Sequence, residues 1–262
     1  MQFNFGKNWL NFSRSALTSD KVAQAQDDFE KLFNGIELQG NSFVDIGFGQ
    51  GLSLLIAKQK GASVIGCDIN PTCEEALKQT MIHFPQYQLS DISLVIGSIL
   101  EQETINKITK GGGNGIDVIH SWGVLHHTGN MKKAIQNISS LVKENGYLVI
   151  SIYNKHWTSP IWLFIKWLYN KLPPLLQKAV AYLFYPIIWL AKYLVTGENP
   201  TKMNRGMDFF YNVVDWVGGY PYEYASIDKI ESLVNQLGFR TIKKIPAQVP
   251  TGCNEFIFRK TM

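Results

Sequence analysis

The stretch Ser42-Phe-Val-Asp-Ile-Gly-Phe-Gly-Gln-Gly51 decides the fold of this chain. A short apolar run that carries one acid, Asp45, breaks into glycines at positions 47, 49 and 51, and a helical pattern follows up to Gly61. This order is typical of a buried strand, a tight turn and a helix. Glycines at alternate positions let the backbone approach a ligand that a Cβ would repel. The helix start adds free N–H groups and a positive dipole end, so the turn is suited to a nucleotide or a carboxylate.

The glycine spacing argues against a dinucleotide site. Such a site needs its third glycine five residues after the first, where this chain has Leu52. Asp45 would also repel a pyrophosphate, whereas it would attract a cationic amino group. With Gly47, Gly49 and Gly51, it resembles the acid-x-G-x-G-x-G motif of class I S-adenosylmethionine (SAM) methyltransferases. The resemblance implies SAM as cofactor, with Asp45 holding its methionine amino group and the glycines admitting its methionine portion.

Length and composition fit one α/β domain with an elaboration. The chain has 262 residues, of which 45% are hydrophobic and 18% charged, enough for a sizeable core. Its three cysteines form no CxxC pair, and no signal peptide is visible at the N-terminus. We therefore expect a cytoplasmic protein, with peripheral membrane contact as an option discussed below.

The positive charge is local. The net charge is +4, but residues 155–205 contain seven basic residues and one acid, so that the remainder is negative. A local excess of this kind does not indicate general affinity for nucleic acid. The chain also lacks an Asn-Pro-Pro-aromatic tetrad and a Pro-Cys pair for work on flipped bases. We expect no nucleic-acid partner.

Strands and helices alternate after the first motif, which predicts a parallel, doubly wound sheet. Further strands are expected at 62–67, 92–96, 116–120, 147–152, 239–245 and 255–259, the last two antiparallel at the sheet's edge. The expected fold class is α/β: a seven-stranded, mostly parallel, Rossmann-like methyltransferase sheet with a helical, aromatic-rich insertion after the fifth strand. The expected parts are an N-terminal helical cap (1–41), a SAM-binding core (42–152), a helical insertion or lid with the substrate region (153–225), and a C-terminal part that completes the sheet (226–262).

Ligands of such sheets bind beyond the carboxyl ends of the strands. Asp68 ends the second strand 19 residues after Gly49, where a carboxylate accepts both hydroxyls of a ribose. The alternative is an acid that only caps the next helix. The family resemblance extends the cofactor site to the strand ends at Ile69, Ser98, Ile99, Ser121 and Trp122. Ser98 stands where the family often has an aspartate for the adenine amino group, which weakens the assignment there.

His126 and His127 follow the fourth strand in a Leu-His-His sequence that resembles many small-molecule methyltransferases. A histidine at this place titrates near neutrality and can take a proton from a substrate hydroxyl. The alternative is a pair that packs and bonds locally. No Cys or Glu lies at ligand spacing from the pair, so we expect no metal.

Residues 159–195 are rich in aromatic and aliphatic side chains with interspersed lysines, and Pro173-Pro174 predicts two helices joined by a bend. The longest uncharged run has 13 residues, which is too short to span a membrane. Three roles remain open for this segment: a lid over an apolar substrate, a homodimer contact, or a helix pair at a membrane interface. The N-terminal aromatics, among them Trp9, either fill the edge of the core or close over the ligand.

Six residues are the candidates for substrate binding, each against a purely structural role: Tyr153, Arg205, Asp215, Trp216, Tyr222 and Glu223. The predicted activity is SAM-dependent methyl transfer to an oxygen, nitrogen or carbon nucleophile of a small-molecule, lipid-like or peptidic acceptor. Two alternatives are an NAD-dependent oxidoreductase and a non-catalytic SAM-binding, membrane-associated protein.

Overall fold

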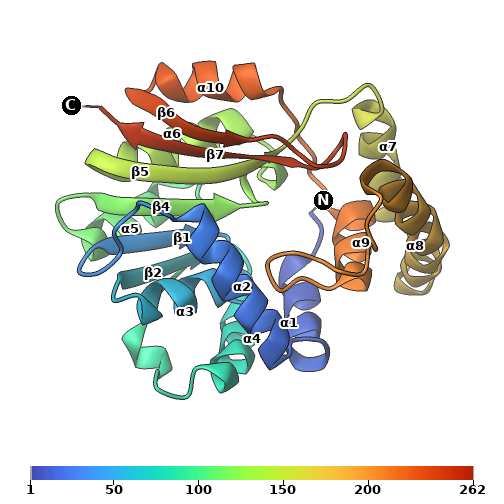
Figure 1. Cartoon of the computed structure of the whole chain (residues 1–262), viewed down its shortest axis with the longest axis horizontal. Coiled ribbons are helices and arrows are strands. Elements are labelled where there is room, and N and C mark those ends of the chain that lie inside the picture. The colour runs from blue at the N-terminus through green and yellow to red at the C-terminus, as the bar shows by residue number, and fades with distance from the viewer. Residues whose placement is uncertain (1, 262) are drawn as a thin grey trace.

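The computed structural model of the chain describes residues 2–261, which fold around one seven-stranded sheet with helices on both faces (Figure 1). The strand order is β3-β2-β1-β4-β5-β7-β6, and only β7 runs antiparallel to its neighbours. The strands are β1 (Ser42–Ile46), β2 (Ser63–Asp68), β3 (Ser93–Ile96), β4 (Ile116–Trp122), β5 (Val142–Tyr153), β6 (Phe239–Ile245) and β7 (Cys253–Lys260). The predicted fold class is confirmed.

Strand β1 lies at the centre of the sheet, between β2 and β4. Residues Phe43 to Ile46 are buried, because helices cover both faces of this strand. From β1 the chain steps outward to β3 and then returns to the other side of β1 at β4. The strand order therefore reverses between β1 and β4, the place where ligands of open α/β sheets bind.

Helices divide the core into two apolar layers. On one face lie α5 (Gln102–Gly112), α6 (Met131–Leu141) and α10 (Ile227–Asn235), which bury Ile108, Ile138 and Val234. On the other lie α2 (Ser19–Leu32), α3 (Leu52–Gln59) and part of α4 (Thr72–Thr80), which bury Leu54 and Leu77. Short 3₁₀ turns cover Met81–His83, Leu89–Asp91 and Leu125–His127.

Several element boundaries differ from those that the sequence predicts, three of them as follows. Helix α5 extends to Gly112, into a glycine run that the sequence assigns to a loop. Strand β5 starts at Val142, which pairs with Ile116 across an irregularity in the register. Strand β7 starts at Cys253, opposite Tyr153 of β5. In the two strands, pairing with a neighbour extends the element beyond its apolar run.

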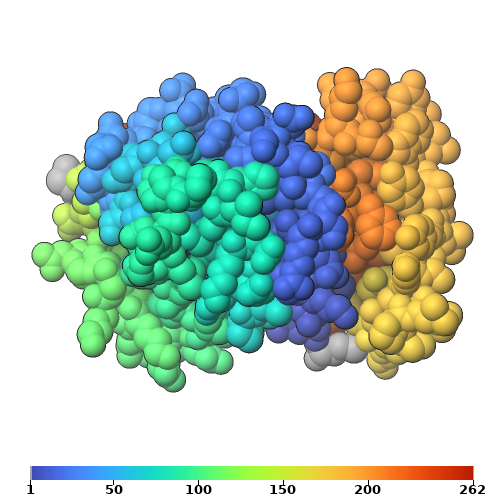
Figure 2. Space-filling view, turned by 90° about the horizontal axis from the view of Figure 1, so that it is seen from below, coloured from blue at the N-terminus to red at the C-terminus, as the bar shows by residue number. Residues whose placement is uncertain are grey.

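The insertion contains three helices at the end of the molecule toward which the parallel strands point (Figure 1). They are α7 (Ser159–Tyr169), α8 (Pro174–Thr196) and α9 (Phe209–Gly218). The expected bend at Pro173-Pro174 separates α7 from α8, and α9 packs against both. Figure 2 shows the insertion forming one end of the molecule, with the N-terminal helix between it and the rest.

Helix α8 changes the sequence-based conclusion that this segment is too short to span a membrane. It is continuous over 23 residues and includes Pro186, and its best 18-residue window has a mean hydropathy of 1.4. By length and composition it therefore passes the test for a membrane span, which the uncharged run alone does not. Only 6% of that window is buried, so α8 is not a core helix of the ordinary kind.

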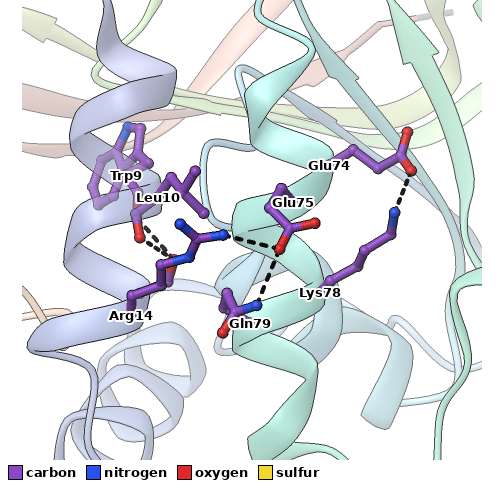
Figure 3. A network of polar contacts seen from close by, with 8 residues as sticks. Trp9, Leu10, Arg14, Glu74, Glu75, Lys78 and Gln79 are labelled. Carbon is purple, nitrogen blue, oxygen red and sulfur yellow. Dashed lines mark hydrogen bonds and ion pairs between the residues drawn. The ribbon is translucent and has the colours of Figure 1, made fainter.

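Helix α1 (Phe5–Ser15) joins the core to the insertion. On the core side it packs on α4, where Arg14 contacts Glu75 at 3.2 Å (Figure 3). Gly6 lies at the closest approach, because a Cβ there would lie 2.4 Å from Cγ of Asn70. On the insertion side, the Asn8 amide donates to the Asp215 carboxylate of α9 at 2.7 Å.

Replacing Gly6 by alanine tests this contact. In an open helix, Gly→Ala stabilises by about 0.5–1 kcal/mol. Here we expect the opposite sign, a loss of about 1–2 kcal/mol in the free energy of unfolding, because the new methyl group displaces the Asn70 side chain from Asn4 and Thr72. Urea denaturation measures the change. Ser15→Ala, on the exposed part of the same helix, is the control and should be neutral or stabilising. A stabilising Gly6→Ala would contradict the close packing.

Candidate active site

A cavity of about 950 Å³ opens beyond the carboxyl ends of β1 to β4. Its floor is formed by the ends of the strands, and its sides by α1, α8, α9 and the loop between β6 and β7. Its size is at the upper end of the usual range for ligand sites, so that a cofactor and a second molecule fit together.

The glycine turn forms one wall of this cavity. Gly47, Gly49 and Gly51 all have positive φ, at 75°, 55° and 77°. A Cβ on Gly47 would lie 2.3 Å from the Val124 side chain, and one on Gly49 would lie 2.9 Å from Nε1 of Trp9. Both the backbone conformation and the space therefore require glycine. At Gly47, which lines the cavity, the backbone of the turn is therefore accessible to a ligand.

Asp68 links the end of β2 to the glycine turn. Its Oδ2 accepts from the Gly49 N–H at 3.1 Å, and its Oδ1 accepts from the Asn70 N–H at 2.9 Å. Burial raises the pKa of this carboxyl, and the two backbone donors partly offset the shift. Each oxygen retains a lone pair, and the carboxylate lines the cavity. This arrangement is suited to accept from a pair of hydroxyl groups.

Two isoleucines and a serine surround the space next to Asp68. Ile69 lines the cavity with 50% of its surface exposed, which is unusual for an isoleucine at a strand end. Ile99 lies buried, and its carbonyl accepts from the Asn137 amide. The Ser98 hydroxyl oxygen accepts from the Leu100 N–H and lines the same cavity. Such a space suits a flat apolar ring that carries polar edges.

Asp45 points away from the large cavity. Its Oδ1 lies 2.7 Å from Nδ1 of His120 on β4, and both residues are buried. On the other side of the ring, Nε2 of His120 lies 3.5 Å from the Arg205 guanidinium, which also stacks on Trp122 with 4.5 Å between the guanidinium carbon and the ring centre. The carboxylate, imidazole and guanidinium thus form a chain that ends at Arg205. They line a smaller cavity of about 80 Å³ next to Gly47.

The adjacent histidines have different surroundings. His127 lines the cavity, and its Nδ1 lies 2.6 Å from the Pro221 carbonyl, so Nδ1 carries the proton and Nε2 the lone pair. Burial is the main cause that lowers the pKa of His127 to about 3. His126 is fully buried beside Tyr153, does not line the cavity, and has a pKa lowered by burial. Of the pair, the structure brings only His127 to the cavity.

A buried lysine that no sequence pattern singles out lies behind the cavity. Lys166 of α7 is fully buried, and its ammonium group donates to the Trp216 carbonyl. The rings of Trp216, Tyr222 and Tyr153 surround the ammonium at 4.4, 4.8 and 5.7 Å. Burial lowers the pKa of Lys166 to about 7. Burial likewise raises the pKa of Asp215, which lines the cavity, to about 7.

The structure brings most of the predicted site residues to one place. The large cavity is lined by Gly47, Asp68, Ile69, Ser98, Ile99, Trp122, His127, Tyr153, Arg205, Asp215 and Trp216. The smaller one adds Asp45 and Gly49. Five others line neither cavity: Gly51, Ser121, His126, Tyr222 and Glu223.

These five residues have structural contacts. Gly51 faces Leu77, because a Cβ added at position 51 would lie 2.3 Å from the Leu77 side chain. The Ser121 hydroxyl donates to the Ile46 carbonyl, and Glu223 accepts from a backbone N–H at the start of α6. Tyr222 packs over Lys166.

Other residues at the site were not predicted. His120, Lys166, Cys253 and Glu255 lie at or behind the cavity. His120 and the β7 residues carry a weak signal, because polar groups interrupt apolar strands there. Lys166 carries none, since it is one of several lysines interspersed along the same apolar segment. Within residues 2–261, no three His, Cys, Asp or Glu side chains gather closely enough to hold a metal ion.

Comparisons with known proteins identify the family. A sequence model described as a methyltransferase domain matches residues 19–182, more than half of the chain. The chain belongs to the methyltransferase domain family. It is a SAM-dependent class I methyltransferase, as the glycine motif indicated. No curated protein matches it by sequence.

Solved structures share the fold of this methyltransferase. Magnesium protoporphyrin IX methyltransferase from Synechocystis, with bound S-adenosylhomocysteine (SAH), is 14% identical with a TM-score of 0.54, and the match covers 100% of this chain and 90% of that one. The same enzyme with bound SAM gives a TM-score of 0.53 at 13% identity, over 100% and 86% of the two chains. An O-methyltransferase family protein from Burkholderia thailandensis is 14% identical with a TM-score of 0.55, over 92% of this chain and 57% of that one. This chain thus spans little more than half the length of that protein.

The family assignment decides between the alternatives that the sequence left open. A nicotinamide-dependent oxidoreductase is not supported, in agreement with the glycine spacing. The methyltransferase family match favours an enzyme over a non-catalytic SAM-binding protein. The comparisons leave the acceptor unspecified.

Replacing Lys166 by methionine tests the buried ammonium group. An unfolded chain keeps Lys166 protonated up to a pH of about 10.5, whereas the folded protein releases the proton at about 7. The unfolded state therefore binds more protons between these values, and Lys166 makes the wild type more stable as the pH rises. Relative to Lys166→Met, we expect the wild type to gain on the order of 1–3 kcal/mol between pH 7 and 9.5. Urea denaturation at both pH values measures the gain. Equal changes in the two proteins would contradict a buried, weakly basic lysine; Lys171→Met, at an exposed site, is the control.

Proposed function

We propose that this methyltransferase modifies a nucleophile on a small amphiphilic acceptor, a molecule with an apolar body and a polar reactive group. The observation that carries the proposal is the two-ended cavity. One end contains the groups suited to the cofactor, and the other is bounded by the aromatic insertion. When bound, SAM supplies a methyl group on a sulfonium leaving group, which becomes SAH as the nucleophile takes the methyl.

The cofactor end fits the adenosine part of SAM. Asp68 offers one free lone pair on each oxygen to the two ribose hydroxyls, and Ile69 and Ile99 provide apolar contact for the adenine. Ser98 offers a hydroxyl to the edge of the ring. The Gly47 backbone borders the space that remains for the methionine part, where a Cβ would be excluded.

We further propose that Arg205 meets the carboxylate of the methionine part. The guanidinium lies next to the glycine turn and lines both cavities. Asp45 then acts through His120, which it orients so that Nε2 faces Arg205. Asp45 then has a positioning role, in addition to any contact, direct or through water, with the amino group that the family resemblance implies.

The acceptor end is mostly apolar with a few polar groups. Trp162, Phe209 and Trp216 of the insertion line it, together with aliphatic side chains of α8. Asp215 and Tyr153 are polar groups at the same place. An aromatic or isoprenoid body would fill this end, and a hydroxyl or amine on it would find hydrogen-bond partners.

Two side chains compete for the role of base. His127 presents a neutral Nε2, but its pKa of about 3 makes it a weak proton acceptor at neutral pH. Asp215 has a pKa of about 7, which matches the value at which a general base works best. Either would accept the proton that the acceptor loses as it takes the methyl group. We favour Asp215 on this ground, with His127 as a hydrogen-bonding neighbour.

Replacing Asp68 by asparagine tests the cofactor end. The amide keeps one oxygen but places a donor against either the Gly49 N–H or a ribose hydroxyl, and it removes the charge. Losing charge-assisted hydrogen bonds costs about 1.5–3 kcal/mol, so we expect SAH to bind about 10- to 150-fold more weakly. Isothermal calorimetry measures the change. The control is Asp27→Asn, on the exposed side of α2. Unchanged affinity for SAH in Asp68→Asn would refute the ribose assignment.

The pH dependence of methyl transfer distinguishes the two bases. With Asp215 as base, the rate rises with pH through about 7, because only the ionised carboxylate accepts a proton. Asp215→Asn should remove that rise and lower the rate about 10²- to 10⁴-fold with little change in SAH affinity. Transfer of a labelled methyl group from SAM to a lipid extract is the assay.

A different profile would assign the base to His127. Since its pKa lies near 3, the rate would then be constant from pH 5 to 9. His127→Asn would in that case cause the large loss, and Asp215→Asn a small one. A rise near pH 7 that survives in Asp215→Asn would exclude both assignments.

A further inference from the structure

The outer face of α7 and α8 exposes a large apolar surface. Of the 19 large hydrophobic side chains that are exposed within residues 2–261, 15 lie between Trp157 and Val195. The most exposed are Leu175 at 78%, Trp157 at 77% and Leu194 at 73%. Soluble monomers rarely expose a contiguous apolar patch of this kind without a partner.

The pattern on α8 forms a continuous stripe. Leu176, Leu183, Ile187, Leu190 and Leu194 are all exposed and follow one another at intervals of seven, four, three and four residues. These intervals place them along one side of a helix. The stripe therefore points away from the protein along the length of α8.

The other side of α8 packs against α9. The rings of Tyr185 and Phe209 lie 4.9 Å apart, and Ala181 is fully buried. Helix α8 is thus attached to the protein along one side and open along the other. A helix fixed in this way does not cross a bilayer by itself.

The charges around the stripe are mostly positive, and the exposed acid Glu198, just after α8, is the exception. Lys155, Lys171, Lys178 and Lys202 are exposed, whereas α7 and α8 contain no acidic residue. Residues 155–205 carry a net charge of +6. In a two-fold dimer through this face, mainly lysines would be brought together, because the same patch occurs on both copies. Anionic lipid head groups would instead neutralise them.

The spacing of the lysines along α8 indicates how this helix is oriented relative to a bilayer. Lys178 and Lys192 are 14 residues apart, which corresponds to about 21 Å of helix, less than the roughly 30 Å of a hydrocarbon core. Trp157, Trp167 and Tyr182 are exposed on the same part of the molecule. Aromatic rings and lysines around an apolar stripe are typical of a helix that lies in the plane of the interface.

The stripe is continuous with the cavity. Val195 and Ala191 are exposed on α8 and also line the cavity, and Ile188 lines it one turn earlier. A membrane that covered the outer face would therefore lie next to the acceptor end. An amphiphile in that membrane could reach the cavity along α8 without passing through water.

We propose that the outer face of α7 and α8 binds the surface of an anionic bilayer, and that the acceptor is an amphiphile that enters the cavity from this surface. The proposal rests on the proposed function for its second half. Its first half stands on the exposed stripe and the lysines alone.

Vesicle sedimentation tests the binding. We expect the full-length protein to sediment with phosphatidylcholine vesicles that contain phosphatidylglycerol, and to bind pure phosphatidylcholine vesicles or high-salt samples much more weakly. Leu183→Glu/Leu190→Glu should lower the partition coefficient about 100-fold or more. Lys171→Glu/Lys178→Glu should lower it more than about 20-fold on anionic vesicles, since each lysine near such a surface contributes about fivefold.

Controls separate the surface from folding and from cofactor binding. Ile82→Glu and Lys132→Glu change an exposed isoleucine and an exposed lysine outside the insertion, and should bind vesicles as the wild type does. Calorimetry with SAH should give the same affinity for all variants. A wild type that does not bind SAH would refute the proposed function. The vesicle result would then still decide whether the outer face of α7 and α8 binds a bilayer.

Two results would overturn the proposal. One is a wild type that binds SAH but does not sediment with anionic vesicles. The other is a dimer, measured by analytical ultracentrifugation, that ignores vesicles and becomes a monomer in Leu183→Glu/Leu190→Glu. That outcome would assign the stripe to a second copy of the chain.

Discussion

The hydrogen bond from the Gly49 N–H to the Asp68 carboxylate holds the cofactor end of the site together. It joins two segments 19 residues apart in the sequence, the turn after β1 and the end of β2. The turn can present its N–H in this direction because Gly49 has a positive φ and no side chain. The same carboxylate accepts from Asn70, whose side chain bonds to Asn4 before α1. One acid thereby connects the glycine turn, the start of α4 and the N-terminal helix.

A second set of contacts runs from α1 into the insertion. Asn8 bonds to Asp215 of α9, and α9 receives the Lys166 ammonium of α7 on its Trp216 carbonyl. Burying a lysine and an acid costs free energy unless each is bonded, and here backbone and amide groups supply the partners. The two ends of the cavity therefore belong to one polar network. Residues in or next to α1 therefore contact both the proposed cofactor end of the cavity and the insertion.

The sequence predicts the fold correctly, and its expectation for the cofactor end comes from the same kind of local pattern. The glycine turn, the apolar strands and the acid at position 68 are short motifs whose spacing has a direct physical reason. The acceptor end depends on contacts between residues far apart in the chain. Asp215 approaches Asn8 over 207 positions, and His127 approaches Pro221 over 94. No periodicity records such pairs, and this is why the sequence does not single out Lys166 and leaves Tyr222 and Glu223 open between a substrate-binding and a structural role.

The motif acid Asp45 shows how a local pattern leaves the partners of a side chain open. Its position two residues before the first glycine favours a place beside the methionine amino group. The structure puts it against His120, because these residues are directly paired across β1 and β4. A buried acid and a buried imidazole on neighbouring strands supply each other with the hydrogen-bond partner that burial requires. The charge that reaches the cavity is then that of Arg205, which the insertion supplies. Because residues 153–225 supply both Arg205 and the aromatic side chains of α7 and α9, the insertion contributes to the proposed cofactor end and to the proposed acceptor end of the cavity.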